Sequence, residues 1–271
     1  IVGFQEKPKD PEPMPDNPDM CLVSMGNYIF SSDSLVSELK NDANADTAHD
    51  FGKNILPALV ESKKLFAYNF YRNKILGDNT PGQNYWKDVG TLQAYYECNI
   101  DLRAANPQLD LYNKSWPIYS YHVPRPPAKF IHNEEVSPNG RARIGKAINS
   151  LVSNGCIISG STVTDSILSS DVVIHSYSTI SESVFLEDVE IKENCSIRNT
   201  IIDKHTVIPC NTMIGYDRKE DEKRYHVVDL PQGKWLTVLG KKGTPKELSS
   251  HITHIEMETE LKSLTVKTVD R

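Results

Sequence analysis

The sequence lacks an apolar run near the roughly 18 residues that a membrane-spanning helix needs, so we expect no membrane contact. It also lacks an excess of basic residues. Its 30 Lys and Arg are outnumbered by 36 Asp and Glu, which gives a net charge of −6. That balance argues against a nucleic-acid partner, but it is compatible with a small phosphorylated ligand that needs only one or two local cations.

Paired cysteines and glycine-rich phosphate loops are missing as well. The five cysteines are an odd number without a CxxC pair, which favours a reducing compartment, and we expect the cytoplasm. Neither GxGxxG nor GxxxxGK[ST] occurs. Because the chain begins with Ile1 rather than Met, we do not expect its visible start to be the translation start.

Between about residues 144 and 214, aliphatic or small apolar residues recur every six positions. A helix repeats near 3.6 residues and a strand near 2, so this period fits neither. It predicts a parallel β-helix, in which a corner follows each short strand and successive coils stack their apolar residues. The predicted inward ladders are Cys195, Ile201, Val207 and Met213; Ile202, Ile208 and Ile214; and Ile174, Ile180 and Leu186, joined by Ile191 and Ile197. The polar residues predicted to face water at the corners are Asp165, Ser166, Glu193, Asn194, Asp203 and Lys204.

Outside these hexads the chain changes character three times. Up to about residue 105, strand-like and helix-like stretches alternate, which predicts an α/β layer. Its predicted strands are residues 1–4, 21–30 and 65–71, and its predicted helices are residues 33–39, 51–62 and 92–105. Residues 107–139 are rich in proline and are expected to form a connector without a long helix or a central strand. After the hexads come a charged segment (217–224), a predicted hairpin or strand pair (225–239) and a polar tail (240–271).

Two short stretches combine residues that suit a phosphorylated sugar and a metal ion. Glu6 and Lys7 stand side by side, and a carboxylate accepts from sugar hydroxyls while a compact ammonium suits phosphate. The simpler interpretation is a solvated ion pair. Asp88 precedes a glycine and a predicted helix, where a carboxylate can hold Mg²⁺ together with phosphate oxygens. A helix N-cap formed by Asp88 or Thr91 is the alternative.

Other polar residues have two interpretations each. Asp50 precedes a predicted helix and is either its N-cap or an acceptor for a ligand hydroxyl. His175 and His205 lie among the hexads, where an acyltransferase carries its general base, although solvent-facing corner positions are favoured. His251 and His254 have the spacing of a metal pair, but no third ligand lies near them in the sequence.

Taken in order, these stretches resemble one family. They are residues 4–8 (FQEKP), 24–28 (SMGNY), 49–52 (HDFG), 86–91 (WKDVGT), 127–130 (PAKF) and the hexads. The set resembles glucose-1-phosphate adenylyltransferases of the bacterial type over residues 1–225. The resemblance implies an α/β fold, namely the C-terminal part of a Rossmann-like nucleotidyltransferase domain (1–106), a Pro-rich connector (107–139), a left-handed parallel β-helix (140–225) and a C-terminal extension (226–271).

The resemblance also implies a reaction and a set of site residues. In such enzymes glucose 1-phosphate and ATP give ADP-glucose and pyrophosphate with Mg²⁺, for glycogen or starch synthesis. Carried over to this sequence, Lys7 binds the sugar phosphate, and Glu6 and Ser24 bind glucose hydroxyls. Tyr28, Asp50, Phe51 and Trp86 line the sugar pocket, Asp88 holds the catalytic Mg²⁺ and Lys204 binds an effector. A homotetramer controlled by allosteric small-molecule effectors is implied as well.

The family's glycine-rich nucleotide loop and its second metal aspartate are not in this chain, so we expect the 271-residue chain to be inactive alone. Three alternatives remain: a non-catalytic regulatory homologue, a uridylyltransferase or other sugar-nucleotide transferase, and a hexapeptide acyltransferase. The candidate residues retained from Glu6 to Asp88 argue against the regulator, and the ordered motifs before the hexads argue against the acyltransferase. The choice of nucleotide base stays open.

Overall fold

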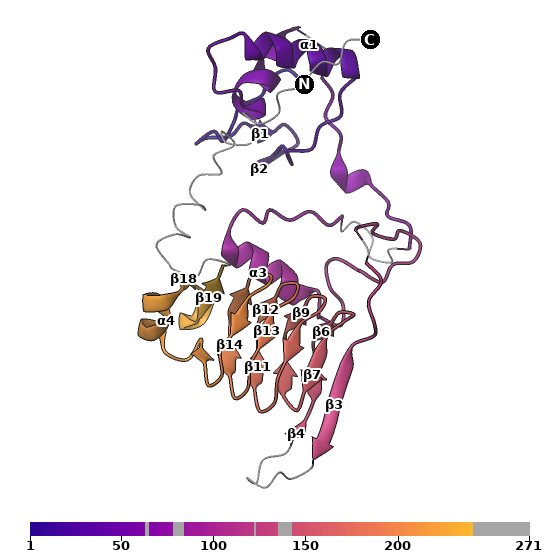
Figure 1. Cartoon of the computed structure of the whole chain (residues 1–271). Helices are drawn as coiled ribbons and strands as arrows, with labels where there is room; N and C mark the ends of the chain where they lie inside the picture. Colours follow the sequence, from indigo (N-terminus) through magenta and orange to yellow (C-terminus); the bar gives the residue numbers. More distant parts are fainter. Residues whose placement is uncertain (63–64, 78–83, 122, 135–142, 241–271) are drawn as a thin grey trace, which may run out of the picture. The chain divides into compact units, whose positions relative to one another are not determined.

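The computed structural model describes residues 1–62, 65–77, 84–121, 123–134 and 143–240. They belong to two compact units, Ile1–Asn73 and Lys74–Arg271, and each unit is described by itself (Figure 1). The division falls at residue 73, before the boundary that we predicted at residue 106. Within the described residues, no helix has both the length and the apolar character to cross a membrane.

The first unit is a small helical cluster with one hairpin. The hairpin pairs β1 (Pro13–Met14) with β2 (Asn17–Cys21) in antiparallel fashion. The helical part consists of α1 (Ser32–Ala43), a π-helical turn η1 (Phe51–Ile55), α2 (Leu56–Ser62) and a 3₁₀ turn η2 (Phe70–Arg72). Its core is Ile55, Leu56 and Leu59, with Phe4, Phe30 and Leu65 packed against them. The predicted helices at 33–39 and 51–62 are confirmed.

The three strands predicted for this unit are wrong, except for Cys21 at the end of β2. Residues 1–4, 22–30 and 65–69 are not in strands, and Val2 and Ile29 are fully exposed. An apolar alternation becomes a strand only where a neighbouring strand takes up its backbone N–H and C=O groups. Within the described part of this unit, the only such pairing is the β1–β2 hairpin.

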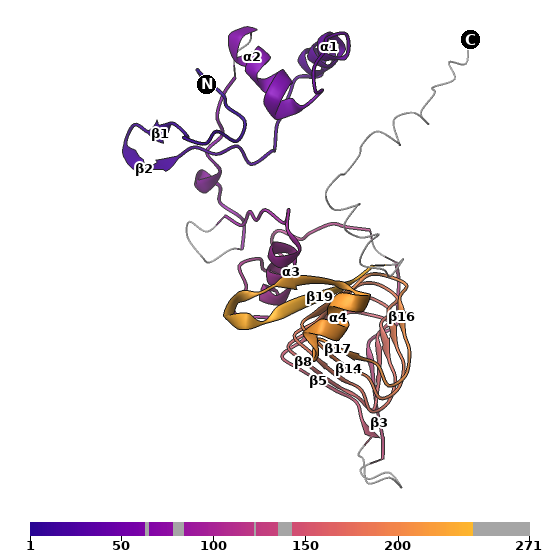
Figure 2. The ribbon, with the colours of Figure 1, turned by 90° about the vertical axis from the view of Figure 1, so that its left-hand side faces the viewer.

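The second unit is a parallel β-solenoid with three sheets, the arrangement predicted from the hexads (Figure 2). The first sheet, in spatial order, is β16 (Val207–Ile208), β13 (Glu190–Ile191), β10 (Val173–Ile174), β7 (Ile157–Ser159), β3 (Lys129–Glu134) and β4 (Arg143–Ile144). The second is β17 (Met213–Ile214), β14 (Ser196–Arg198), β11 (Thr179–Ser181), β8 (Thr162–Thr164) and β5 (Lys146–Ile148). The third is β18 (His226–Asp229), β19 (Trp235–Leu239), β15 (Thr200–Ile202), β12 (Val184–Phe185), β9 (Ile167–Leu168) and β6 (Leu151–Val152).

The solenoid begins earlier than predicted. β3 pairs in parallel with β7 and antiparallel with β4, so it lies inside a sheet. The prediction that residues 107–139 hold no central strand is therefore wrong for Lys129–Glu134. The prolines before it end at Pro127, which leaves every residue of β3 with a backbone N–H for the ladder.

The coils are shorter than three full hexads, and this difference corrects the predicted ladders. The first coil repeats after 16 residues, as from Lys146 to Thr162, and the following coils repeat after 17, as from Thr162 to Thr179. Left-handed backbone at Asp171, Asp188 and His205 marks one corner, with a sequence separation of 17 from each coil to the next. The second corner, at Tyr177, Asn194 and Asn211, keeps the same separation, as does the third at Asp165, Glu182 and Asn199. The corners thus follow one another after six, five and six residues, as from 171 to 177, 182 and 188. A strict period of six therefore drifts from the inner to the outer face.

The buried residues show the consequence of this drift. The ladder of Ile202, Ile208 and Ile214 is confirmed, and the buried core also contains Ile174, Ile180, Ile191, Cys195 and Ile197. Val207 and Met213 instead point outward and are 55% and 56% exposed, so the fourfold ladder with Cys195 and Ile201 is wrong. Leu186 is only half-buried, because Phe185 occupies the inward position on β12.

One outer face of the solenoid is covered by helix α3 (Leu92–Asp101), which the sequence predicted over 92–105. α3 packs against β12 and β18 of the third sheet. The apolar cluster beneath it contains Tyr96 from α3 and, from the sheet, Ile167, Val184, Ile201, Leu236 and Val238. Ile201 is buried for this reason although it lies on the outer side of its sheet. α3 thus belongs to the solenoid unit.

The third corner carries a ladder of hydroxyl groups. Ser150 Oγ accepts from the Ser166 backbone N–H at 3.0 Å, Ser166 Oγ from that of Ser183 at 3.1 Å, and Ser183 Oγ from that of Thr200 at 3.3 Å. Each hydroxyl follows a left-handed corner residue and satisfies an amide of the next coil. The predicted exposure of Ser166 is therefore wrong. The predicted exposure is confirmed for Glu193, Asn194 and Lys204, whereas Asp165 and Asp203 are half-buried.

The last coil is closed by a short helix and a hairpin. The charged segment forms α4 (Arg218–Arg224), whose N-cap Asp217 accepts from the backbone N–H groups of Lys219 and Glu220. The predicted hairpin is confirmed: β18 and β19 pair antiparallel around a 3₁₀ turn η3 (Pro231–Gly233), and β19 continues the third sheet beside β15. Residues 241–271, with His251 and His254, lie outside the described residues.

Candidate functional site

In the first unit, the aromatic rings of Tyr28, Phe30 and Phe51 gather around the start of η1. The rings of Tyr28 and Phe51 are stacked, with centroids 6.3 Å apart and an interplanar angle of 11°. Phe30 lies beside both of them, at 6.4 and 6.1 Å. Tyr28 and Phe51 are both partly exposed. The cluster therefore presents an apolar aromatic face of the kind on which ring-shaped ligands stack.

The hydroxyl groups of Ser24 and Tyr28 meet at the edge of this aromatic cluster. Their oxygens are 2.8 Å apart, and Ser24 Oγ also accepts from the Gly26 backbone N–H at 3.2 Å. Gly26 has a φ of 72°, a left-handed conformation that glycine adopts without strain. The tight turn at Gly26 brings together two residues that the resemblance assigns to sugar binding.

Glu6 and Asp50 approach each other across Gly52. A Cβ atom on Gly52 would lie 2.2 Å from Glu6 Oε2 and 3.4 Å from Asp50 Oδ1, so the missing side chain leaves room for both carboxylates. Asp50 Oδ1 accepts from the Lys53 backbone N–H at 2.8 Å, which confirms its interpretation as a helix N-cap. Its role toward a ligand hydroxyl stays a prediction.

Lys7 follows Glu6 directly in the sequence, and its side chain is held loosely. Its side chain is 91% exposed, and its Nζ lies 3.9 Å from Glu6 Oε1. An exposed pair at this distance contributes little to folding. The geometry agrees with the solvated ion pair, and it leaves the ammonium accessible to an anionic ligand.

Trp86 and Asp88 belong to the second unit, ahead of α3, and both are exposed. Asp88 Oδ1 accepts from the Gly90 backbone N–H at 2.9 Å, and Thr91 Oγ1 accepts from that of Ala94 at 3.1 Å. Of the two predicted caps, Thr91 is the N-cap of α3, and Asp88 instead stabilises the turn before it.

The residues around Asp88 fit a metal ion that takes most of its ligands from elsewhere. Among the described residues, no three His, Cys, Asp or Glu side chains cluster as ligands for a metal. Mg²⁺ commonly uses one or two carboxylates and completes its octahedron with phosphate oxygens and water. An exposed carboxylate whose orientation is fixed by one backbone N–H suits that mode of binding.

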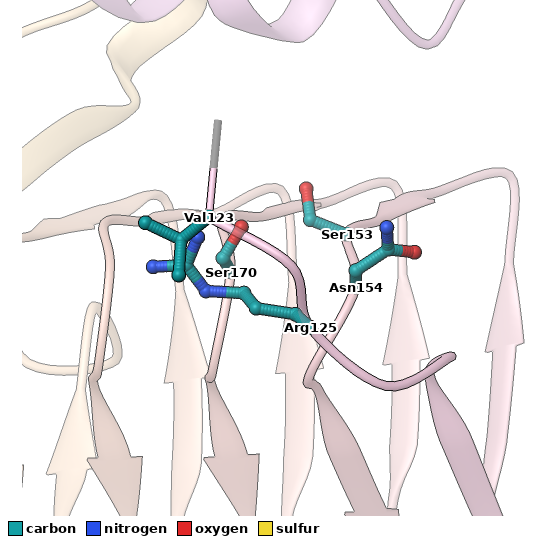
Figure 3. A pocket seen from close by; sticks show the side chains of 5 residues that line it. All are labelled: Val123, Arg125, Ser153, Asn154 and Ser170. Carbon is teal, nitrogen blue, oxygen red and sulfur yellow. The ribbon is translucent and has the colours of Figure 1, made fainter. Parts of the chain in front are cut away.

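Lys204, the predicted effector residue, lies at an exposed corner of the solenoid. Along the same rim, backbone hydrogen bonds link Asp171 to Asn154, Asp188 to Ser170 and His205 to Glu187 in successive coils. A cavity of about 300 Å³ lies on this rim, lined by Val123, Arg125, Ser153, Asn154 and Ser170 (Figure 3). Arg125 is paired with Asp171 at 2.5 Å and with Glu187, so its charge is already balanced.

The two histidines among the hexads, His175 and His205, each lie within hydrogen-bond distance of a carboxylate. His205 Nδ1 lies 2.9 Å from Asp188 Oδ2 at an exposed corner, as predicted. His175 is half-buried, and its Nε2 lies 2.7 Å from Glu190 Oε1. Lys192 and then His175 hold the pKa of Glu190 below its ordinary value. The pairing of both histidines gives no support to an acyltransferase base.

All five cysteines are free thiols.

A second cavity, which the sequence did not indicate, lies beside α3. It has a volume of about 210 Å³ and is lined by Tyr85, Lys87, Glu97, Cys98, Asp101 and Gln108. Burial, followed by a hydrogen bond with Cys98, raises the pKa of Tyr85 to about 12. The lining residues come from three separate stretches of sequence, and no short motif joins them. The cavity borders the Trp86–Asp88 segment through Lys87.

Comparison with known proteins finds similarity for both parts of the chain. A family described as nucleotidyl transferase matches residues 1–105, and one described as GlmU-like, C-terminal hexapeptide matches residues 126–231. The chain is 46% identical over 231 residues to the glucose-1-phosphate adenylyltransferase of Anaeromyxobacter sp. (strain Fw109-5), covering 84% of this chain and 55% of the relative.

Two further relatives give the same result. Glucose-1-phosphate adenylyltransferase of Alteromonas mediterranea is 45% identical over 225 residues, covering 83% of this chain and 49% of the relative. Glucose-1-phosphate adenylyltransferase 2 of Pseudoalteromonas atlantica is 46% identical over 226 residues, covering 83% of this chain and 51% of the relative. The chain thus spans about half the length of the curated relatives it matches.

Proposed function

We propose, for a chain that is homologous to glucose-1-phosphate adenylyltransferases along 84% of its length, that the whole protein containing it makes ADP-glucose. Its substrates are ATP and glucose 1-phosphate, and its second product is pyrophosphate. The observation that carries this proposal is the 46% identity over 231 residues, a match that runs through both the nucleotidyl transferase segment and the hexapeptide segment.

The first unit is suited to the sugar phosphate. The stacked rings of Tyr28 and Phe51 provide an apolar surface for the pyranose ring, and Ser24 stands at its edge. The carboxylates of Glu6 and Asp50 accept hydrogen bonds from sugar hydroxyls. The exposed ammonium of Lys7 binds the phosphate as a point charge.

The reaction needs alignment of two substrates and neutralisation of charge, with no nucleophilic side chain. A phosphate oxygen of glucose 1-phosphate forms a bond to the α-phosphorus of ATP, and the bond from that phosphorus to the bridging oxygen breaks, which releases pyrophosphate. In our proposal Lys7 orients the attacking phosphate, Trp86 contributes to the sugar pocket and Asp88 binds Mg²⁺. When bound, Mg²⁺ neutralises the charge on the phosphate oxygens.

The remaining parts of the proposal concern the cellular setting. The ADP-glucose supplies glycogen or starch synthesis in the cytoplasm. The protein assembles as a homotetramer, and allosteric small-molecule effectors bind it near Lys204. Lys204 supports this role because it is exposed, and its only hydrogen bond in the described part of the chain is donated by its backbone N–H to Asp203.

The test uses the full-length protein with glucose 1-phosphate and, in separate reactions, ATP, UTP, CTP and GTP in the presence of Mg²⁺. Pyrophosphate release is followed continuously, and the sugar nucleotide is identified by mass spectrometry. We expect ADP-glucose with ATP as the preferred nucleotide. A preference for UTP would replace adenylyl by uridylyl transfer, and the absence of turnover with every nucleotide would favour the non-catalytic homologue.

A further inference from the structure

The segment that carries Asp88 adjoins helix α3 at both of its ends. On one side Tyr85 lines the same cavity as Cys98 of α3. On the other side Thr91 caps the helix through the Ala94 backbone N–H. Between these two ends, the Asp88 carboxylate is fixed by the Gly90 N–H. The position of Asp88 therefore follows the position of α3.

α3 and Arg103, which follows it, are in turn fastened to one corner of the solenoid in two neighbouring coils. The Tyr96 hydroxyl donates to the Glu182 backbone carbonyl at 2.7 Å, and Arg103 Nη1 lies 3.0 Å from Asp165 Oδ1. Glu182 and Asp165 occupy the same corner in neighbouring coils. Tyr96 is 7% exposed and packs among the apolar residues of the third sheet. Burial raises its pKa, so the hydroxyl remains a donor at neutral pH.

We propose that Tyr96 is a positioning residue for Asp88, which acts through α3 and fixes the Trp86–Asp88 segment against the solenoid. The inference rests on the proposed function, since it assigns Asp88 a place in that reaction. Tyr96 lies in the second turn of α3, close to the end of the helix from which the Asp88 segment extends. A shift of one part of a helix displaces its end as well. A displacement near 1 Å at a reacting group lowers the reaction rate strongly.

Packing alone does not require the hydroxyl group of Tyr96. A phenylalanine would fill the same apolar cluster, but it would leave the Glu182 carbonyl without this donor. A hydrogen bond from a buried hydroxyl fixes the rotation and the height of a helix on the surface beneath it, because it has a preferred distance and direction. Apolar contacts alone have no such direction.

The experiment compares Tyr96→Phe with Tyr95→Phe in the full-length protein. Tyr95 lies on the same helix, and its hydroxyl makes no hydrogen bond within the described residues. The first readout is backbone hydrogen exchange without metal or substrate. For Tyr96→Phe we expect faster exchange in residues 84–94, about fivefold for the loss of one hydrogen bond, and unchanged exchange in the coils from 157 to 208. Tyr95→Phe keeps the wild-type pattern.

The second readout is turnover as a function of Mg²⁺ concentration, below the melting temperature of every variant. For Tyr96→Phe we expect kcat to fall about fivefold and the half-saturating Mg²⁺ concentration to rise. A lower Tm with wild-type exchange in residues 84–94 and wild-type Mg²⁺ dependence would overturn the inference and leave Tyr96 a purely structural residue. A wild-type protein without adenylyl transfer would overturn the proposed function, and this inference with it.

Discussion

Replacement of Asp221 by Ala should destabilise the end of the solenoid more than any other change in α4. Its side chain is 1% exposed, and one carboxylate oxygen, Oδ2, accepts three hydrogen bonds. The donors are the Gly215 backbone N–H at 2.8 Å, Trp235 Nε1 at 3.0 Å and Thr237 Oγ1 at 3.1 Å. The residue thus joins the last coil, the closing helix and strand β19.

The magnitude follows from the groups that the substitution leaves without an acceptor. Gly215 and Thr237 are buried, whereas Trp235 is half-buried and can turn to water. An orphaned buried donor costs about 1–3 kcal/mol, and rupture of a buried charged network costs about 3–5 kcal/mol. We therefore expect Asp221→Ala to lower the free energy of unfolding by about 4 kcal/mol. Asp221→Asn retains one acceptor oxygen and should cost about 1–2 kcal/mol.

Equilibrium unfolding in guanidinium chloride at pH 7 measures these differences, with fluorescence of Trp235 as a reporter inside the network. The matched control is Glu222→Ala, one position further along the same helix. Glu222 is exposed and pairs with Arg218 at 2.6 Å, so we expect its loss to cost about 0.5 kcal/mol. If Asp221→Ala and Glu222→Ala shift the unfolding midpoint equally, the assigned network does not stabilise the fold.

Three further predictions concern charged side chains. Lys7→Gln should raise KM for glucose 1-phosphate about tenfold, since it removes the charge offered to the phosphate, while KM for ATP stays constant; equal affinities in steady-state kinetics would remove Lys7 from the site. Asp88→Asn should lower Mg²⁺-dependent turnover at least about a hundredfold with little effect on sugar binding; an intact rate would make Asp88 only a turn residue. The lowered pKa of Glu190 adds stability above pH 4.5, its ordinary value, which is lost as the pH falls from there through the pKa of the folded state. Acid unfolding followed by circular dichroism should therefore be less steep in Glu190→Gln than in the wild type, and identical curves would show that the Glu190 pairs do not contribute.

The candidate site illustrates what short motifs convey. Capping is local, because a side chain and a backbone N–H two or three residues away decide it, and the capping roles of Asp50 and Thr91 were correctly among the sequence predictions. The approach of Glu6 to Gly52 joins residues that lie far apart in the chain, and no spacing in the sequence indicates it. The roles of Tyr96 and Arg125 were missed for the same reason, since their partners lie in coils far along the chain.

The sequence alone determined the solenoid, because a near-sixfold recurrence of apolar residues has one common structural explanation and the contacts that satisfy it are between similar neighbouring coils. It did not determine which residues face outward. The shortened coil places Val207 and Met213 in solvent and Ser166 in the interior, and these positions depend on the accumulated length of the corners.

Tertiary structure also decided the outcome for segments whose local pattern pointed elsewhere. The RKEDEKR stretch is typical of a solvated helix, yet Asp221 is enclosed by the last coil and β19. The Gly215 N–H and the Thr237 hydroxyl donate to its carboxylate there, and nothing in the local sequence indicates these donors. The alternating apolar residues of 22–30 have the composition of a strand, but a strand exists only with a neighbour to take up its backbone hydrogen bonds. Local preferences are set by the residues themselves, whereas pairing and enclosure are set by whatever the rest of the fold brings beside them.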